Sequence, residues 1–394
     1  MSGMPEARFR ERTDAAFYAP RMERIDSSVM DGVLSAEAAF DPDSYYACDV
    51  REAISKERLE PYDFGALLSP AAEGLTEEIA RRARAITRDH FGNAVCMFTP
   101  LYASNFCESR CRYCGFNRDN DIVRARLTPE EVDVEMESIA GSGLTEILLL
   151  TGESDRHSDL EYIGMLVDKA AEHFASIGLE VYPMNSDDYR MMHERGADYV
   201  TIFQETYDPV TYGRVHLGGR KRVFSYRFNA QERALMGGMR GVGFGALLGI
   251  REDWRKDAFS CGMHGYLLQR RYPWAEISYS LPRLRPCNGH GEDDTAVTER
   301  DLLQVATAYR LFMPFAGETV STRELPRFRD GIVNICATKV SAGSSVRIGG
   351  HSDVEDQGDG QFDLSDTRGV EEVRSALEAM GLQPVFNDYV RSDR

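Results

Sequence analysis

The sequence lacks several features that would place the protein in common classes. None of its apolar runs reaches the roughly 18 residues that a membrane-spanning helix needs. Its N-terminus, MSGMPEARFRERTDAAFYAP, has no apolar core, so we expect no secretory signal peptide. There is no G-x-S-x-G elbow, no phosphate-binding P-loop and no pair of histidines at metal-binding spacing. The sequence therefore does not indicate a membrane protein, a serine hydrolase or a P-loop nucleotide hydrolase.

Positive charge is also scarce. The chain has 46 Lys and Arg residues against 64 Asp and Glu residues, which gives a formal net charge of −18. Nucleic acids and anionic membranes are bound through clustered positive charge, so we expect neither as a partner. The acidic surface is expected to serve solubility.

Cysteine is scattered except in one short run. Three of the eight cysteines form Cys107-Glu-Ser-Arg-Cys111-Arg-Tyr-Cys114, with the spacing C-x3-C-x2-C. One loop thus delivers three thiolates, one fewer than the four that fill a Cys₄ iron–sulfur cluster. A zinc site would need a fourth Cys or His nearby, and none follows Cys114 within forty residues. The run therefore predicts a [4Fe–4S] cluster with one iron open to a small ligand.

This spacing resembles the signature of the radical S-adenosylmethionine (SAM) enzymes. In that family the open iron binds the amino and carboxylate groups of SAM and delivers the electron that cleaves it. Tyr113, just before the last cysteine, is an aromatic residue against which a nucleoside could pack. The non-enzymatic alternative is an electron-transfer protein, for which four protein ligands would be expected. An oxygen-sensitive cluster predicts a reducing, cytoplasmic location.

Apolar, β-rich runs alternate with longer amphipathic stretches, which is the rhythm of a parallel sheet. Eight runs are found, at residues 94–102, 146–153, 179–185, 199–206, 243–250, 276–284, 318–324 and 335–342. They predict an α/β fold, a (β/α)₈ barrel of the TIM type, with the active site at the C-terminal ends of its strands. Thr128-Pro129-Glu130-Glu131 predicts a helix start with a capping box after the first run.

Three segments are expected along the chain. Residues 1–93 read as an N-terminal helical extension and residues 94–350 as the barrel. Residues 351–394 read as an acidic linker, a C-terminal helix and a short tail. Residues 351–366 are acidic, contain glycine and have few aliphatic side chains, so they are expected to form a flexible connection.

Candidate binding residues fall at the ends of the predicted strands. Glu153 ends the second run and suits a SAM ammonium group, whereas Glu205 ends the fourth and could accept from ribose hydroxyls. Gly245, on the fifth run, has no side chain and could let adenine lie against the backbone. Arginines at the mouth could bind a carboxylate in two places, or could simply pair with a neighbouring carboxylate; they are Arg283, Arg285 and Arg323.

Beyond the cysteines, the chain resembles the 2-iminoacetate synthase family, the tyrosine lyases of thiamine-thiazole biosynthesis. The matching segments run from about residue 65 to 390 and are LLSPAAEG, FGNAV, PLYASNFC, CRYCGF, LLLTGE, QETYDP, GALLGI, DWR, PRLRPC, STRE, VSAGSS and GLQPV. Residues 1–60 match poorly. The resemblance implies a complete radical SAM barrel that cleaves the Cα–Cβ bond of L-tyrosine to 2-iminoacetate and p-cresol, after hydrogen abstraction from the amino nitrogen.

The resemblance also implies roles for single residues. Cys107, Cys111 and Cys114 would hold the [4Fe–4S] cluster. Tyr113, Glu153, Glu205, Gly245 and Arg285 would contact SAM. Matching the related tryptophan lyase, Arg323 would clamp the substrate carboxylate, and Tyr102 and Ser341 would flank its amino group. The implied partners are L-tyrosine, a reductant such as flavodoxin or ferredoxin, and the thiazole synthase.

Two related lyases share part of this sequence pattern. The tyrosine lyase of hydrogenase maturation carries three further cysteines in a C-terminal extension, whereas only Cys336 lies beyond residue 300 here. The tryptophan lyase stays an alternative because it shares the amino-acid anchor. The Gly115-Phe116 continuation of the cysteine motif favours tyrosine over tryptophan.

Overall fold

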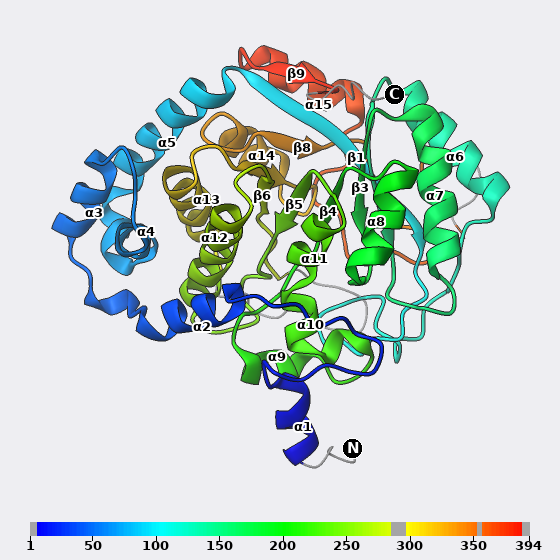
Figure 1. Ribbon diagram of the computed structural model, residues 1–394. Coiled ribbons are helices and arrows are strands. Elements are labelled where there is room, and N and C mark those ends of the chain that lie inside the picture. The colour runs from blue at the N-terminus through cyan, green and yellow to red at the C-terminus, as the bar shows by residue number, and fades with distance from the viewer. Residues whose placement is uncertain (1–5, 285–296, 353–356, 388–394) are drawn as a thin grey trace.

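The computed structural model describes residues 6–284, 297–352 and 357–387. Eight parallel strands form a closed barrel in which each strand pairs with the next and β1 pairs with both β2 and β8 (Figure 1). The strands are β1 Ala94–Ser104, β2 Glu146–Thr151, β3 Ser176–Glu180, β4 Tyr199–Thr201, β5 Gly241–Phe244, β6 Glu276–Ser280, β7 Gly317–Val320 and β8 Lys339–Ser341. The predicted (β/α)₈ barrel is confirmed.

Helices surround the strands and extend from them. The helices before the barrel are α1 Glu6–Thr13, α2 Val29–Ala39, α3 Ala47–Ser55, α4 Pro61–Leu68 and α5 Thr76–Phe91. Those within and after it are α6 Pro129–Gly141, α7 Leu160–His173, α8 Ser186–Arg195, α9 Pro209–Val215, α10 Phe224–Phe228, α11 Ala230–Met236, α12 Trp254–Arg271, α13 Glu299–Phe312, α14 Pro326–Val333 and α15 Val370–Ala379. In the described part of the chain, each helix is too short or too polar to cross a membrane.

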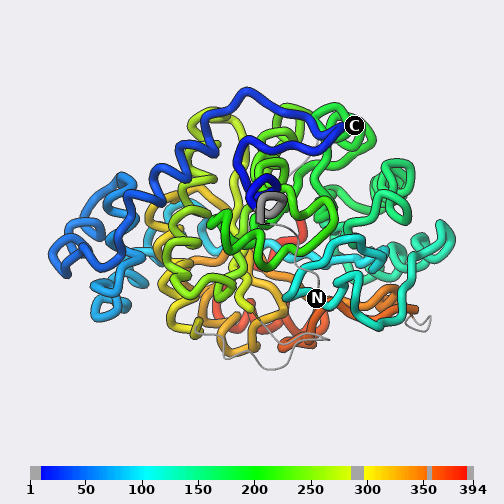
Figure 2. Tube along the Cα trace, turned by 90° about the horizontal axis from the view of Figure 1, so that it is seen from below, coloured from blue at the N-terminus to red at the C-terminus, as the bar shows by residue number. Residues whose placement is uncertain are grey.

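The N-terminal helices cover two different parts of the barrel. Helix α2 packs on α12, and α4 and α5 pack on α13, whereas α1 lies apart against α9 and α10 (Figure 1). Viewed from below Figure 1, the N-terminal segment runs across the face that carries α9 and α10 (Figure 2). Helices were predicted for residues 1–93, and α1 to α5 lie there; the division of the chain into three segments stays a prediction.

The predicted capping box at the start of α6 is present. The Thr128 hydroxyl accepts from the Glu131 amide at 3.3 Å, and the Glu131 carboxylate accepts from the Thr128 amide at 2.7 Å. The box satisfies donors that the first helical turn leaves open. It fixes where the chain leaves the loop that follows β1.

The predicted third strand differs from the observed one. The expected run was 179–185, but β3 spans Ser176–Glu180 and pairs Ser176 with Glu146 and Glu180 with Leu150. Pro183 has no amide hydrogen for a ladder, and Asn185 is the N-cap of α8. After Glu180 the chain leaves the sheet, and Val181 lines the cavity at the mouth of the barrel.

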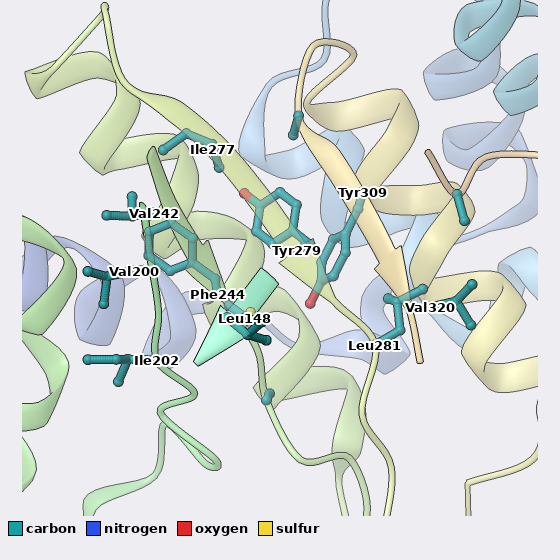
Figure 3. Packing of buried hydrophobic residues seen from close by; sticks show 14 of the residues in the cluster. Leu148, Val200, Ile202, Val242, Phe244, Ile277, Tyr279, Leu281, Tyr309 and Val320 are labelled. Atoms are coloured by element: carbon teal, nitrogen blue, oxygen red, sulfur yellow. The ribbon is translucent and has the colours of Figure 1, made fainter. Parts of the chain in front are cut away.

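The core lies between the strands and the surrounding helices (Figure 3). Tyr279 of β6 stacks on Tyr309 of α13 with ring centroids 4.4 Å apart, and its hydroxyl donates to the Gly262 carbonyl of α12 at 3.0 Å. Val242, Phe244 and Ile277 are buried on neighbouring strands. This packing holds α12 and α13 against the outside of the barrel. The side chains on the inner face of the strands line the cavities instead.

The C-terminal region differs from the expected flexible linker and tail. Residues 357–366, here called the strap, are held by backbone hydrogen bonds: the Gly115 amide donates to the Gln361 carbonyl at 3.2 Å, and the Ser365 amide to the Thr322 carbonyl at 2.9 Å. The predicted helix is α15, and it is followed by a ninth strand, β9 Gln383–Val385, parallel to β1. For residues 357–366 the expected flexibility was wrong, because acidic, glycine-containing composition does not reveal backbone bonds made to other loops; residues 353–356 of the expected connection lie outside the described residues.

Candidate functional site

The three cysteines lie in the loop of residues 105–127, which follows β1. The Arg110 amide donates to the Gly218 carbonyl at 3.2 Å and the Arg112 amide to the Val215 carbonyl at 3.0 Å. These bonds hold the loop against the segment after α9. All three thiols face one cavity at the C-terminal ends of the strands, here called the mouth cavity.

The arrangement of the thiols fits a cluster better than a single metal ion. Among the described residues, no three His, Cys, Asp or Glu side chains are close enough together to share one ion. A zinc site would need such convergence, whereas the ligands of a [4Fe–4S] cluster each bind a different iron. Burial raises the pKa of the Cys107 thiol to about 12. Ionisation there requires a compensating positive charge, which iron would supply.

Two carboxylates and two cations form a buried network beside the cysteines. Arg227 donates to Glu153 at 2.7 Å, and Lys221 donates to Glu205 at 2.7 Å. Burial raises the pKa of Glu205, but Lys221 and Arg227 outweigh it and leave the pKa below its ordinary value. Glu205 is therefore held as an anion, and Glu153 is fixed in position by Arg227; both lie in the wall of the mouth cavity.

Glu205 has an unusual backbone conformation. Its φ is +72°, in the left-handed region that favours glycine. Two residues further on, the Tyr207 amide donates to the Asp257 carboxylate at 2.7 Å, and the Thr206 hydroxyl donates to the same oxygen at 3.1 Å. These bonds fix the turn and direct the Glu205 side chain into the mouth cavity.

Tyr113 and Gly245 have different positions relative to the mouth cavity. Tyr113 lines it, and its hydroxyl lies 2.7 Å from Nε2 of the buried His216. Gly245 is not among the residues that line it. A Cβ at Gly245 would meet the Phe203 ring at 2.6 Å, so this glycine lets Phe203 pack against the strand. Phe203, not Gly245, faces the cavity.

A second cavity lies inside the barrel and shares part of its wall with the first. It is here called the inner cavity. Residues that line both cavities are Tyr102, Leu150, Glu180, Thr201, Phe203, Pro282, Arg323 and Phe362. The two spaces therefore meet at the level where the strands end.

Two of the predicted substrate residues lie at this junction, and the third lies in the wall of the inner cavity. Arg323 stacks its guanidinium 3.8 Å from the centre of the Phe362 ring. Tyr102 donates from its hydroxyl to Gln361 at 3.1 Å. Ser341 lines the inner cavity and accepts from the Thr322 amide at 3.2 Å. The strap thus supplies a partner to both Arg323 and Tyr102.

The other mouth arginines differ from Arg323. Arg283 makes two hydrogen bonds to Glu324, at 2.8 Å and 2.6 Å, so the alternative of an ion pair holds for it. Arg285 lies outside the described residues. No hydrogen bond from the Arg323 guanidinium and no ion pair within 4 Å is found in the part of the chain that the structure describes.

The floor of the inner cavity is polar. Lys339 pairs with Glu146, and the Tyr199 hydroxyl donates to the same carboxylate at 2.7 Å. Tyr199 and Lys339 also line a third pocket, formed by the first residues of the strands at the opposite end of the barrel. This network of Glu146, Lys339 and Tyr199 separates the inner cavity from that end.

Several site residues escaped the sequence analysis. Glu180 ends β3, so the rule that selected Glu153 and Glu205 could have found it if the third run had been placed correctly. Lys221 and Arg227 lie between strands without a motif. Gln361 and Phe362 lie in a segment read as flexible. Nothing in their local sequence marks these last four.

Comparisons with known proteins give two family matches. Residues 101–258 match the Radical SAM superfamily, and residues 280–383 match the Biotin and Thiamin Synthesis associated domain. The 2-iminoacetate synthase of Escherichia coli (strain K12) is 39% identical over 343 residues, which cover 87% of this chain and 91% of that protein. The 3-methylornithine synthase of Methanosarcina barkeri is 28% identical and covers 52% of this chain and 60% of its own length.

Solved structures agree with this assignment. The [FeFe]-hydrogenase maturase HydG from Carboxydothermus hydrogenoformans aligns with a TM-score of 0.83 at 27% identity, covering 92% of this chain and 86% of that one. Methylornithine synthase (PylB) aligns with a TM-score of 0.69 at 24% identity, covering 86% of this chain and 97% of that one, which supports the fold alone.

Proposed function

The chain belongs to the 2-iminoacetate synthase family of radical SAM enzymes, and from this premise we propose that it cleaves the Cα–Cβ bond of L-tyrosine. The products are 2-iminoacetate and p-cresol. One observation carries the proposal: Arg323, an arginine without an ion-pair partner among the described residues, lines both the inner cavity and the mouth cavity, where the three cysteines lie.

The residues at the mouth hold the cofactors. Cys107, Cys111 and Cys114 would bind a [4Fe–4S] cluster, and Glu153 would receive the amino group of SAM, with Glu205 and Tyr113 beside it. When bound, the cluster and SAM supply the radical that abstracts hydrogen. The buried Lys221 and Arg227 hold both carboxylates in place, so little reorganisation is needed when a cation binds.

The residues at the junction orient the amino acid. Arg323 would bind its carboxylate through a planar fork, and the Phe362 ring keeps that fork flat against the strap. Tyr102 and Ser341 would flank the amino end. The aromatic ring would enter the inner cavity, whose walls include Phe98, Leu148 and Leu150. The barrel thereby shields the reacting atoms from water.

Product analysis tests the proposal. Protein reconstituted anaerobically with iron, sulfide, SAM and a reductant should form p-cresol, glyoxylate (from hydrolysis of 2-iminoacetate) and 5′-deoxyadenosine when L-tyrosine is added. Faster turnover of tryptophan would instead support a tryptophan lyase. A flavodoxin or ferredoxin would serve as reductant, which is tested by using it in place of dithionite. A thiazole synthase would take the product, which is tested by co-purification of the two proteins.

Replacement of Arg323 tests the clamp directly. Charge-assisted hydrogen bonds to a carboxylate contribute about 1.5–3 kcal/mol, so Arg323→Ala should weaken tyrosine binding by roughly 10- to 100-fold. Arg323→Lys should restore little, because an ammonium cannot reproduce the fork. Arg283→Ala is a control that removes a mouth arginine committed to Glu324. Unchanged tyrosine binding by Arg323→Ala would defeat the clamp.

A further inference from the structure

Glu180 is a carboxylate inside the barrel that stands apart from its neighbours in how it is bonded. No hydrogen bond and no ion pair within 4 Å involves its side chain among the residues that the structure describes. The other acidic side chains around the cavities are engaged: Glu153 with Arg227, Glu205 with Lys221, and Glu146 with Lys339. The accessible part of Glu180 faces the two cavities, whose walls it helps to form.

The strand register places Glu180 level with the predicted substrate residues. Glu180 pairs with Leu150 of β2, and Leu150 pairs with Tyr102 of β1. Adjacent strands lie about 4.8 Å apart, so the Cα atoms of Tyr102 and Glu180 are roughly 10 Å apart. Tyr102, Glu180 and Arg323 all line both cavities, so the three side chains meet at the same junction.

The junction thus holds a cation and an anion that are not paired with each other. Arg323 and Glu180 both face it, and each is without an ion-pair partner in the described structure. A free amino acid is a zwitterion that carries one charge of each sign on neighbouring atoms. A cation and an anion kept apart across one cavity complement such a ligand, because both charges remain unsatisfied until it binds.

We propose that Glu180 binds the α-amino group of the amino-acid substrate and accepts one proton from it, while Arg323 binds the α-carboxylate. This inference rests on the proposed function and adds a residue to it. In the proton step, an N–H bond of the ammonium group breaks and an O–H bond forms on Glu180. A neutral amine and a carboxylic acid result, and no oxidant or reductant is consumed.

The surroundings of Glu180 favour this role. Burial raises the pKa of its carboxyl group to about 7, with Glu205 adding to the increase and Arg323, Lys221 and Arg227 opposing it. Tyr102 faces it from β1, and burial raises the pKa of that hydroxyl far above its ordinary value, so Tyr102 stays neutral. A carboxylate with a pKa near 7 can both hold an ammonium group and take its proton near neutral pH.

Binding measurements with two ligands test the inference. The holoenzyme, with its cluster oxidised and neither SAM nor reductant added, cannot turn over. Its affinity is measured by calorimetry for L-tyrosine and for 3-(4-hydroxyphenyl)propanoate, which lacks only the amino group. Glu180→Gln should weaken tyrosine binding at least 10-fold and change the affinity for the analogue less than 2-fold. Glu318→Gln is the matched control, because burial also raises the pKa of that carboxyl to about 7 but it pairs with Arg310 away from the cavities.

The pH dependence separates a binding role from a structural one. Tyrosine affinity of the wild type should increase as the pH is raised through about 7, because Glu180 becomes ionised. Glu180→Gln should lose this step, and Glu180→Asp, which keeps the charge on a shorter side chain, should retain it.

Three outcomes would overturn the inference. Unchanged tyrosine affinity in Glu180→Gln would do so, and so would an equal loss for both ligands. If Glu180→Gln does not fold, the inference would be overturned by tyrosine affinity that does not increase through about pH 7 in either Glu180→Asp or the wild type. Wild-type protein that bound neither ligand would overturn the proposed function itself, which distinguishes the two failures.

Discussion

At the scale of single residues, ion pairing distinguishes side chains that hold the barrel together from those that face its cavities. Arg310 with Glu318, and Arg329 with Asp366, are buried pairs in the barrel wall and beneath the strap. Removing one partner of such a pair leaves an uncompensated buried charge and costs stability. Among the described residues Arg323 and Glu180 have no such partner, so replacing either should leave no uncompensated buried charge behind.

The cysteine loop gives a prediction for single residues that would hold the cluster. Replacing Cys107, Cys111 or Cys114 with alanine should each abolish cluster retention, because the loss of one thiolate exposes a second iron. The exposed Cys48 is the control, and Cys48→Ala should keep the wild-type iron content. Iron and sulfide assays after anaerobic reconstitution measure the difference. Full iron content in any of the three loop variants would contradict the assignment of that ligand.

Glu180 also has a consequence for stability. Its folded-state pKa of about 7 lies above the ordinary value of 4.5, so the folded state binds the proton more tightly than the unfolded state. Stability is then lost as the pH rises from about 4.5 to 7. Glu180→Gln removes this cost and should raise the free energy of unfolding at pH 8 by at most about 3 kcal/mol.

The gain should fall below about 1 kcal/mol at pH 5, where the folded-state carboxyl is protonated and the unfolded-state carboxyl is only partly ionised. Thermal unfolding of the apo-protein at both pH values measures it. An equal difference in melting temperature at pH 5 and pH 8 would assign the change to packing instead of charge.

At the scale of elements, the strap closes over the cysteine loop by close backbone approach. A Cβ at Gly115 would lie 2.4 Å from the Gln361 carbonyl oxygen, a distance that atoms in contact do not adopt. Gly115→Ala should therefore displace the strap and increase amide hydrogen exchange in residues 357–366. Gly331→Ala in α14 is the control, since nothing lies within 4 Å of the added methyl group. Wild-type exchange in Gly115→Ala would show that the strap is not held at this point.

How far the sequence predicts the structure also depends on the element. Periodicity and turn chemistry predicted the strands and the start of α6 well, because Thr128, Pro129 and Glu131 act locally. The end of β3 was misplaced because apolar character continues past Glu180 into the mouth. The strap and β9 were missed because their order comes from hydrogen bonds to residues far away in the sequence, such as Gln361 with Gly115 and β9 with β1.

The same limit applies to the site. The cysteines and Glu153 were found because motif spacing and strand ends are local signals. Lys221 and Arg227 were not, since only the fold brings them to Glu205 and Glu153. Arg323 was found by its position at a strand end, but its freedom from an ion pair was settled only by the structure, as was the pairing of Arg283.

At the scale of the whole molecule, two family matches share one closed barrel. The radical SAM match covers β2 to β5 and residues 101–104 of β1, and the Biotin and Thiamin Synthesis associated match runs from the last residue of β6 through β7 and β8 to the first residue of β9. Neither set of strands closes without the other, because β1 pairs with β8 and β5 pairs with β6. An isolated half would leave long strand edges unpaired.

The apo-protein should therefore unfold in one cooperative step. Far-ultraviolet circular dichroism and near-ultraviolet tyrosine signals should give coincident thermal transitions. Two separated transitions, one for each match, would show that the halves are independent domains. The prediction that residues 94–350 form one unit would then be wrong.

The stacking of the two cavities has a kinetic consequence. The inner cavity lies between the floor of Glu146, Lys339 and Tyr199 and the mouth cavity with its cysteines. A SAM molecule seated at Glu153 would stand between the amino acid and solvent. Tyrosine would then have to bind before SAM. In the same way, p-cresol would leave only after the fragments of SAM have dissociated. Steady-state rates should show a compulsory order of addition, with excess SAM slowing turnover by trapping enzyme that has not yet taken up tyrosine.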